Sequence, residues 1–237
     1  MTNKFSIILP VRNGINYVKE CVTSILEQTF QDFNLIILDN NSSDGTYEWL
    51  QSLNSEKIII HRTTKDLDIN ANWRRANFIN TNEFVTFIGH DDRYHSNYLS
   101  SINELISEFP DASIYQTQFH YIDSAGKFVR ECKPMQEKIL VQDFLKGQFT
   151  NTLDSMGTGY VFRYKDFKKL DGFSDNYPNL IFSDYQIFVE LTGISYLAVS
   201  PLYTFDYRLH KSLSITTDAE KNYRVERIMF QFSFCIS

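Results

Sequence analysis

A short apolar run followed by an amphipathic helical stretch recurs along the first half of the chain, and this alternation constrains the fold more than any other feature. The apolar runs are too short for helices and are typical of strands buried on both faces; they cover residues 5–9, 35–38, 58–60 and 84–88. Strands that alternate with helices predict βαβ units. We therefore expect an α/β fold with a mostly parallel central sheet and helices on both faces.

The alternation holds to about residue 110, and the pattern then becomes irregular. Residues 113–123 alternate polar and apolar side chains like an exposed strand, and residues 156–173 predict a strand followed by a short helix. A short helix is expected over residues 183–193, with Ser183 as its N-cap, and a strand over residues 195–210.

No linker rich in Gly, Pro or Ser separates the two parts, so we expect a single domain across residues 1–237. It comprises a half of alternating strands and helices (1–110), an irregular half (111–215) and a C-terminal helix (216–237). The apolar positions of that helix could pack on the domain, on a second copy or on a membrane surface; they are Val225, Ile228, Met229 and Phe232.

The charge, the cysteines and the length of the apolar runs limit which partners the protein can bind and in which cellular compartment it is expected. The net charge of -6 and the lack of a Lys/Arg run argue against a nucleic-acid partner. Cys21, Cys132 and Cys235 form neither a metal-binding spacing nor a disulfide framework, which fits a reducing cytosol. No stretch reaches the roughly 18 apolar residues of a membrane span. We expect a cytoplasmic protein, with the C-terminal segment offering peripheral contact with the inner face of the membrane.

Polar side chains follow three of the expected strands. They form the segments 10–13 (Pro-Val-Arg-Asn), 39–41 (Asp-Asn-Asn) and 90–92 (His-Asp-Asp). In open α/β sheets, ligands bind beyond the carboxyl ends of the strands. One polar turn after a strand is ordinary loop chemistry, but three such turns predict a ligand site.

The adjacent carboxylates of Asp91 and Asp92 suit a hard cation such as Mg²⁺ or Mn²⁺. The alternative is a helix N-terminus that favours acidic residues near its dipole. The phosphate-loop, dinucleotide, serine-hydrolase and zinc-protease motifs are all missing from the sequence. Residues 156–159 (Met-Gly-Thr-Gly) are too short for a phosphate loop, so we expect their small side chains to permit a close backbone approach.

These segments together resemble a known family. Residues 6–46 contain, in this order, a strand, Pro-x-x-Asn, a helix ending in Gln-Thr, a second strand and Asp-x-x-Ser-x-Asp-Gly-Thr. With residues 72–76 (Asn-Trp-Arg-Arg-Ala), 89–92 (Gly-His-Asp-Asp) and 182–188 (Phe-Ser-Asp-Tyr-Gln-Ile-Phe), the chain resembles family 2 glycosyltransferases with the GT-A fold, a Rossmann-like fold. The resemblance covers roughly residues 4–210, and the stretch 6–46 is its most specific part.

The resemblance implies transfer of a sugar from a nucleoside-diphosphate sugar, commonly a UDP-sugar, to a glycan or lipid-linked acceptor with inversion at the anomeric carbon. It makes the second half the acceptor side. Asn40 stands where many members have a second Asp, which bears on the base preference. The residues it assigns to nucleotide binding are Pro10, Arg12, Asn13, Asp39, Asn40, Arg75 and Asp91.

The same resemblance implies a metal-assisted reaction. Asp92 would bind Mn²⁺ or Mg²⁺, while His90 has no assigned role. Asp184 would be the general base, although Ser183 precedes it where the family often has Glu; Asp171 and Asp175 are its competitors. The late Arg-x-His segment assigns phosphate contacts to Arg208 and His210.

Two other classes of function compete with this one. A non-catalytic homologue that binds nucleotide sugars or acts as a scaffold would fit Asn40 and the missing Glu before Asp184. A nucleotidyltransferase can share this kind of sheet, but it is expected to carry a Gly-rich basic loop after the first strand, and residues 10–17 contain one Gly. Asp92 and Asp184 together favour the glycosyltransferase.

Overall fold

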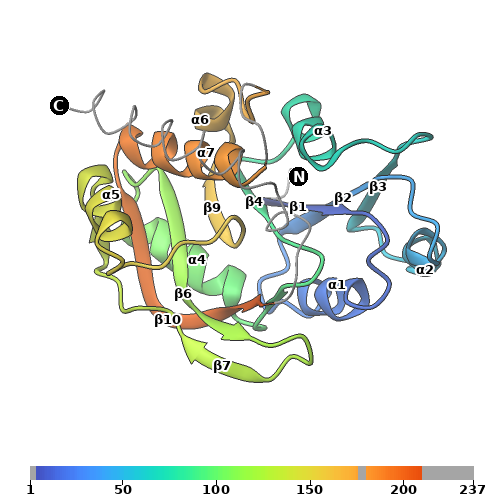
Figure 1. Cartoon of the computed structure of the whole chain (residues 1–237), viewed down its shortest axis with the longest axis horizontal. Helices are drawn as coiled ribbons and strands as arrows, with labels where there is room; N and C mark the ends of the chain where they lie inside the picture. The colour runs from blue at the N-terminus through green and yellow to red at the C-terminus, as the bar shows by residue number, and fades with distance from the viewer. Residues whose placement is uncertain (1–3, 176–179, 210–237) are drawn as a thin grey trace.

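The computed structural model describes residues 4–175 and 180–209, which form a ten-stranded sheet covered by helices (Figure 1). The strands are ordered β3-β2-β1-β4-β9-β6-β10-β5, while β7 pairs with β6 and β8 with β10. Their bounds are β1 Phe5–Val11, β2 Phe33–Asp39, β3 Ile58–Arg62, β4 Phe84–Phe87, β5 Arg93–Tyr94, β6 Ile114–Ile122, β7 Phe128–Glu131, β8 Lys138–Ile139, β9 Tyr160–Arg163 and β10 Leu197–Arg208.

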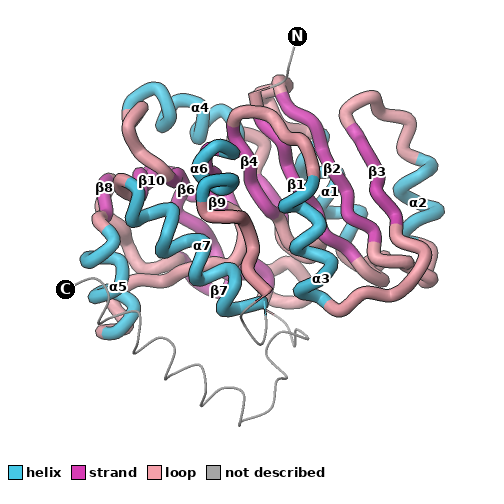
Figure 2. The backbone as a smooth tube through the Cα atoms, turned by 90° about the horizontal axis from the view of Figure 1, so that it is seen from above, coloured by secondary structure: helices cyan, strands magenta, loops and turns pink. Residues whose placement is uncertain are grey.

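The helices cover both faces of this sheet (Figure 2). One face carries α1 (Val18–Leu26), α2 (Thr46–Ser52) and α4 (Tyr98–Glu108). The other carries α3 (Ile69–Arg74), the 3₁₀ turn η1 (Arg75–Phe78), α5 (Val141–Phe149), α6 (Tyr164–Lys169) and α7 (Leu180–Ile194). The predicted α/β fold, with a mostly parallel central sheet between helices, is confirmed.

The strands of the parallel half are mostly apolar because helices cover both faces of the sheet there. β1 lies between β2 and β4 and runs parallel to both. Successive side chains of a strand point to opposite faces, so Ile7 packs in the core with α1 and Ile8 in the core with α3. Both are at most 1% exposed. Helices on the two faces therefore favour apolar residues along β1. Ser6 is the exception, and its buried hydroxyl donates to Asn34 Oδ1 (2.8 Å).

The second half departs from the exposed strand expected at residues 113–123. β6 lies in the middle of the sheet, between antiparallel β9 and parallel β10, and almost all of it is buried. Its polar side chains find partners inside the protein: Thr117 donates to the carbonyl of Gln118 (3.0 Å), and the Gln116 amide contacts Met135 Sδ (3.0 Å). The prediction was wrong because internal hydrogen bonds, rather than water, satisfy the polar positions.

Helix boundaries also differ from expectation. α7 already includes Leu180, so Ser183 lies inside the helix and is no N-cap; its hydroxyl donates to the carbonyl of Ser174 (3.3 Å). α3 ends at Arg74 and the chain continues as η1. Asp68 caps this helix by accepting from the Ala71 N–H (2.7 Å).

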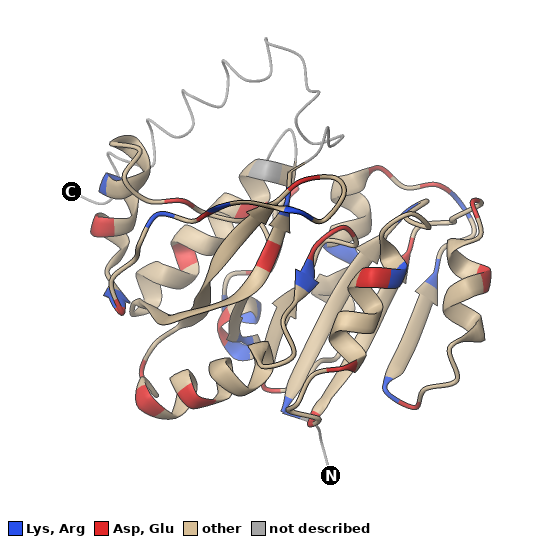
Figure 3. Ribbon diagram, turned by 90° about the horizontal axis from the view of Figure 1, so that it is seen from below, with Lys and Arg blue, Asp and Glu red and all other residues tan. Residues whose placement is uncertain are grey.

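Acidic and basic positions are interspersed over the described ribbon (Figure 3). Among the described helices, none combines the length and apolarity needed to span a bilayer. His210 and the expected helix at 216–237 lie outside the described residues.

Candidate functional site

The carboxyl ends of β1, β2 and β4 meet at one edge of the sheet. Val11 at the end of β1 pairs with Asp39 at the end of β2. Just after β4, Ile88 donates its backbone N–H to the carbonyl of Ile8 in β1 (3.0 Å). The three polar segments therefore leave the sheet at the same edge, as expected for parallel strands.

The turns after β1 and β2 hold each other through side-chain to backbone hydrogen bonds. The Asn13 N–H donates to Ser42 Oγ (3.0 Å), and the Asn13 side-chain oxygen accepts from the Ser43 N–H (2.9 Å). Asn13 and Asn41 have φ values of 50° and 52°, a left-handed conformation that Asn tolerates better than most residues. Ser42 and Ser43 therefore hold the two turns together.

Asp39 is fully buried at this edge, and its two carboxylate oxygens differ in their surroundings. Oδ2 accepts from the Ser42 N–H (3.3 Å) and lies 3.5 Å from Arg62 Nε. Oδ1 is shielded from solvent and has no hydrogen-bond partner among the described residues. A buried acceptor without a donor costs about 1–3 kcal/mol, so Oδ1 is a place where a ligand N–H would be stabilising.

Asn40 uses its amide inside the protein. Its Nδ2 donates to the carbonyl of Leu67 (2.8 Å), and its Oδ1 accepts from the Leu67 N–H (2.8 Å) and from Thr63 Oγ1 (3.3 Å). Asn40 therefore fixes the loop over residues 63–67 beside Asp39. Its predicted contact with a nucleotide stays a prediction.

The other predicted nucleotide-binding residues near β1–β3 differ in exposure. Pro10 is buried within β1, and Arg12 is exposed and forms an ion pair with Asp66. Arg75 donates to the carbonyl of His61 at 2.6 Å. Its guanidinium therefore ties η1 to the end of β3 and is not a freely solvated helix arginine.

The pair Asp91–Asp92 lies above Gly89, well before the next helix. α4 begins at Tyr98, with β5 in between, so the helix N-terminus alternative for these carboxylates is wrong. A Cβ on Gly89 would come within 2.6 Å of Asp91 Oδ1 and 2.9 Å of Asp92 Oδ2. Only the missing side chain at Gly89 leaves room between the two carboxylates.

Asp92 is buried and held on both oxygens. Oδ1 accepts from the backbone N–H of Arg208 (2.9 Å), and Oδ2 accepts from Thr158 Oγ1 (2.8 Å). Burial and the neighbouring charge of Asp91 raise the pKa of Asp92 well above its usual range. Each oxygen keeps a further lone pair, and a divalent cation would offset the repulsion, so these residues fit an Mg²⁺ or Mn²⁺ ion.

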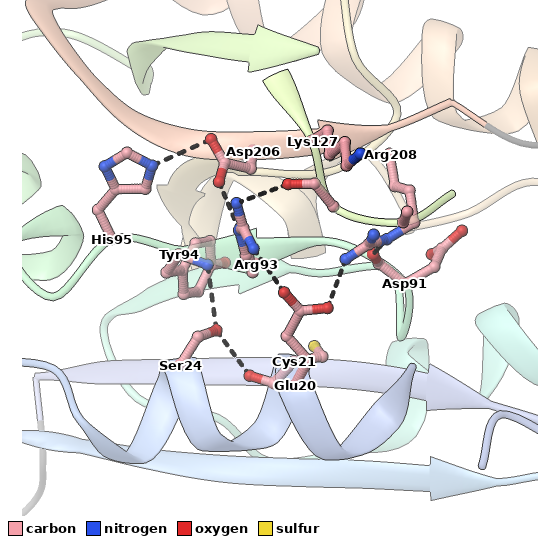
Figure 4. A network of polar contacts seen from close by, with 12 residues as sticks. Glu20, Cys21, Ser24, Asp91, Arg93, Tyr94, His95, Lys127, Asp206 and Arg208 are labelled. Atoms are coloured by element: carbon pink, nitrogen blue, oxygen red, sulfur yellow. Dashed lines mark hydrogen bonds and ion pairs between the residues drawn. The ribbon is translucent and has the colours of Figure 1, made fainter. Parts of the chain in front are cut away.

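Arg208 is buried and braces this carboxylate pair through its side chain (Figure 4). Nε donates to the carbonyl of Asp91 (2.6 Å), Nη1 to the carbonyl of Asp123 (3.1 Å), and Nη2 to Glu20 Oε2 (2.6 Å). The guanidinium therefore has most of its donors satisfied by the protein. Its predicted phosphate contact stays a prediction.

Asp184 is the most isolated carboxylate of the second half. Its Oδ1 is shielded from solvent and lacks a hydrogen-bond partner within residues 4–175 and 180–209. Burial raises the pKa of Asp184 well above its usual range. Of its competitors, Asp171 is exposed, and Asp175 is exposed with Arg74 3.7 Å away, so neither has this environment.

The short loop over residues 156–159 links the two carboxylate sites, a role that the sequence did not reveal. Thr158 binds Asp92, while a Cβ on Gly157 would lie 2.9 Å from Asp184 Oδ2. Gly159 has φ 76° and lies against the Phe205 ring, where a Cβ would come within 2.8 Å. The expected close backbone approach is confirmed, and it occurs against both an aromatic ring and a carboxylate.

Sequence reasoning also missed a network that joins α1, β5 and β10 (Figure 4). Glu20 Oε1 lies 2.5 Å from Arg93 Nη1, and Arg93 Nε lies 2.5 Å from Asp206 Oδ2. Glu20 on α1 also pairs with Arg208 in β10. Arg93 and Glu20 therefore connect Asp206 to Arg208, which are both in β10. Its members are widely spaced in the sequence and fall in no motif, so no local signal identifies them.

Comparisons with known proteins agree with this geometry. The family model Glycosyl transferase family 2 matches residues 6–171. An uncharacterized glycosyltransferase of Rickettsia bellii is 24% identical over 210 residues, covering 86% of this chain and 30% of its own length. The GalNAc(5)-diNAcBac-PP-undecaprenol beta-1,3-glucosyltransferase of Campylobacter jejuni is 26% identical over 234 residues, covering 94% of this chain and 70% of its own length.

Among solved structures, S. aureus TarS 1-349 in complex with UDP-GlcNAc superposes with a TM-score of 0.76 and 16% identity. The match covers 95% of this chain and 65% of that one. The same TarS fragment in complex with UDP gives a TM-score of 0.74 and 17% identity. At these identities the structures show a shared fold.

Proposed function

The chain belongs to glycosyl transferase family 2, and from this premise we propose that it transfers a sugar from a UDP-sugar to a glycan or lipid-linked acceptor with inversion at the anomeric carbon. One observation carries the proposal: the loop over residues 156–159 binds the Asp92 carboxylate through Thr158 and passes close to Asp184, whose Oδ1 has no hydrogen-bond partner among the described residues. Inverting transfer needs this combination, because the leaving group and the proton acceptor lie on opposite sides of the sugar.

The donor nucleotide would bind at the edge formed by β1, β2 and β4. We assign the free Oδ1 of Asp39 to an N–H of the base, since it is buried and has no donor within the described residues. Asp91, next to the metal-binding position, would contact the ribose. The remaining residues assigned to this pocket are Pro10, Arg12, Asn13 and Arg75. Asn40 would shape the pocket by fixing the loop over residues 63–67.

The diphosphate would lie over Asp91 and Asp92. A Mg²⁺ or Mn²⁺ ion held by Asp92 would supply electrostatic stabilisation to the departing diphosphate. The Arg208 backbone N–H donates to the Asp92 carboxylate and its Nε donates to the backbone carbonyl of Asp91. Arg208 is also the assigned phosphate contact on the protein side.

Asp184 would accept the proton of the acceptor hydroxyl. As that proton moves to the carboxylate, the acceptor oxygen forms a bond to the anomeric carbon, and the bond from that carbon to the diphosphate oxygen breaks. Burial raises the pKa of Asp184 well above its usual range, and a raised pKa makes a carboxylate a stronger base. Within the described residues no donor binds Asp184 Oδ1, so this oxygen is available to an acceptor hydroxyl.

The acceptor class is proposed from the relatives. The Campylobacter jejuni relative carries an undecaprenol-linked glycan in its name, and a bacterial lipid-linked glycan or surface polysaccharide is the acceptor class that we propose. Such an acceptor would bring the protein to the inner face of the membrane as a peripheral protein.

Calorimetry with a panel of nucleotide sugars, in the presence and absence of Mn²⁺, tests this function. We expect one UDP-sugar to bind with Mn²⁺ and to be hydrolysed slowly without an acceptor. The lack of donor binding under both conditions would contradict the proposed function. Binding with neither hydrolysis nor transfer to extracted lipid-linked glycans would instead identify the non-catalytic homologue.

A further inference from the structure

Two imidazoles and a carboxylate meet on the sheet outside the proposed sugar site. His95 follows β5, His120 lies in β6 and Asp206 lies in β10, so three strands contribute one residue each. His95 Nε2 and His120 Nδ1 lie 3.0 Å and 3.2 Å from Asp206 Oδ1. All three atoms fall within 4.8 Å of one another.

The fold holds each member of this cluster, which we call the His-His-Asp cluster, in place. Asp206 pairs in register with His120 across β6 and with Arg93 across β5. The His120 ring stacks on Tyr203 with a centroid distance of 5.0 Å and an interplanar angle of 7°. The cluster is therefore ordered by strand pairing and aromatic packing before any ligand arrives.

The position of each member also leaves an open side. Asp206 is 2% exposed, and Arg93 Nε binds its other oxygen at 2.5 Å. The side chains of His95 and His120 are 38% and 22% exposed. Proteins orient metal ligands through hydrogen bonds to neighbouring groups. Here Arg93 fixes the buried carboxylate of Asp206, and the two imidazoles reach solvent.

The separations fit a transition-metal ion. Ligands about 2.0–2.1 Å from a tetrahedral Zn²⁺ lie roughly 3.3 Å apart. The two distances to Asp206 are close to this value, and the two imidazole nitrogens lie within 4.8 Å of each other. Imidazole nitrogen suits Zn²⁺ and its neighbours, whereas Mg²⁺ and Mn²⁺ prefer oxygen. The donor set therefore differs from that of Asp91 and Asp92.

We propose that His95, His120 and Asp206 form a second metal site, which binds Zn²⁺ or a similar transition-metal ion through two nitrogens and one oxygen, with water in the remaining position. The ion would join β5, β6 and β10 at one point. Arg93 follows Asp92 in the chain, and Arg208 comes two residues after Asp206, so the site would stabilise the strands that hold the Asp91–Asp92 pair.

Titration of tag-free, chelator-treated full-length protein with Zn²⁺ tests the proposal. Excess Mg²⁺ is present throughout, because it occupies oxygen-only sites. We expect one Zn²⁺ per chain, a higher melting temperature that EDTA reverses, and, with Co²⁺ as probe, visible absorption typical of four-coordinate nitrogen and oxygen ligands.

His95→Ala and His120→Ala should each weaken Zn²⁺ binding at least tenfold, and the double variant should abolish it. His61→Ala is the matched control, since His61 is an exposed histidine on β3, and it should bind Zn²⁺ like the wild type. Unchanged affinity in the double variant would overturn the proposal. The Co²⁺ spectrum needs no variant, so its absence in the wild type would overturn the proposal even if the substituted proteins failed to fold.

Discussion

The two ends of the proposed site are assembled in opposite ways. At the donor end, Asp39 and the turns around it come from consecutive parallel strands and are held by local hydrogen bonds. At the acceptor end, Asp184 comes from α7, touches Gly157 from a distant loop, and has no hydrogen bond to Oδ1 within the described chain.

This difference suggests that the donor end serves mainly substrate binding and the acceptor end mainly the chemical step. The donor end is satisfied almost everywhere, so it is pre-organised and rigid. The acceptor end keeps a carboxylate whose charge is costly until a substrate arrives. Substitutions at the acceptor end should therefore change the rate, whereas those at the donor end should change donor affinity or stability.

The largest effect is expected for Asp184→Asn. Losing the proton acceptor should lower the transfer rate by roughly 10²- to 10⁴-fold, because an amide cannot take up the acceptor proton. Donor affinity should stay near the wild-type value. Steady-state transfer assays together with donor titrations measure both quantities.

Asp171→Asn and Asp175→Asn are the matched controls for this substitution, since both carboxylates are exposed. Each should transfer sugar at close to the wild-type rate. Full activity in Asp184→Asn, or its loss in either control, would assign the base elsewhere.

Asp92→Asn should have the next largest effect. The amide can still accept from the Arg208 N–H and contact Thr158, so the fold should persist, but the negative charge facing the diphosphate is lost. We expect transfer to fall roughly 10²-fold or more and donor binding to lose its dependence on Mn²⁺. Donor titration at several Mn²⁺ concentrations distinguishes this result; an unchanged metal dependence would place the ion elsewhere.

Because of Asp184, protein stability and the transfer rate should depend on pH in opposite directions. The raised pKa of Asp184 means that the folded state binds its proton more tightly than the unfolded state does. The contribution of Asp184 to stability is therefore present below its unfolded pKa of about 3.9 and is lost as the pH rises through its folded pKa. Transfer should show the reverse trend, because the base must be ionised.

Asp184→Asn should remove this pH dependence and raise the free energy of unfolding at neutral pH, by about 1.4 kcal/mol for each unit of pKa shift. Urea denaturation of both proteins across the pH range measures it. Parallel pH–stability curves for wild type and variant would show that the carboxylate is solvated in the folded protein.

Asn40→Asp should have the smallest effect of the substitutions at the donor end. The carboxylate cannot donate to the Leu67 carbonyl, so the loop over 63–67 should loosen and the protein should lose about 1–2 kcal/mol of stability. Donor affinity should change by less than about threefold, or 0.7 kcal/mol. Thermal unfolding and calorimetry measure the two effects; a large change in preference among nucleotide bases would instead give the Asn40 side chain a direct contact.

The same contrast explains what could be predicted from sequence. The parallel half was predictable because apolar runs buried on both faces have a pattern of their own, and because the ends of parallel strands must converge. The role of Thr158 was not predictable, since it depends on β9 reversing direction between β4 and β6. β6 was misjudged for the same reason: its polar residues are satisfied by partners that only the tertiary fold supplies.

The long-range contacts of Arg208 determine which parts of the site can fold early during synthesis. Its contacts with Asp92 and Glu20 span 116 and 188 residues of sequence. A nascent chain that has emerged to residue 150 already holds β1 to β4, yet the carboxylate pair still lacks Thr158 and the strand that braces it. At translation speeds of about 5–20 residues per second, the remaining stretch to residue 208 takes roughly 3–12 s. During that interval the donor edge can fold on the ribosome, while the charged pair remains unbraced until the last described strand is released.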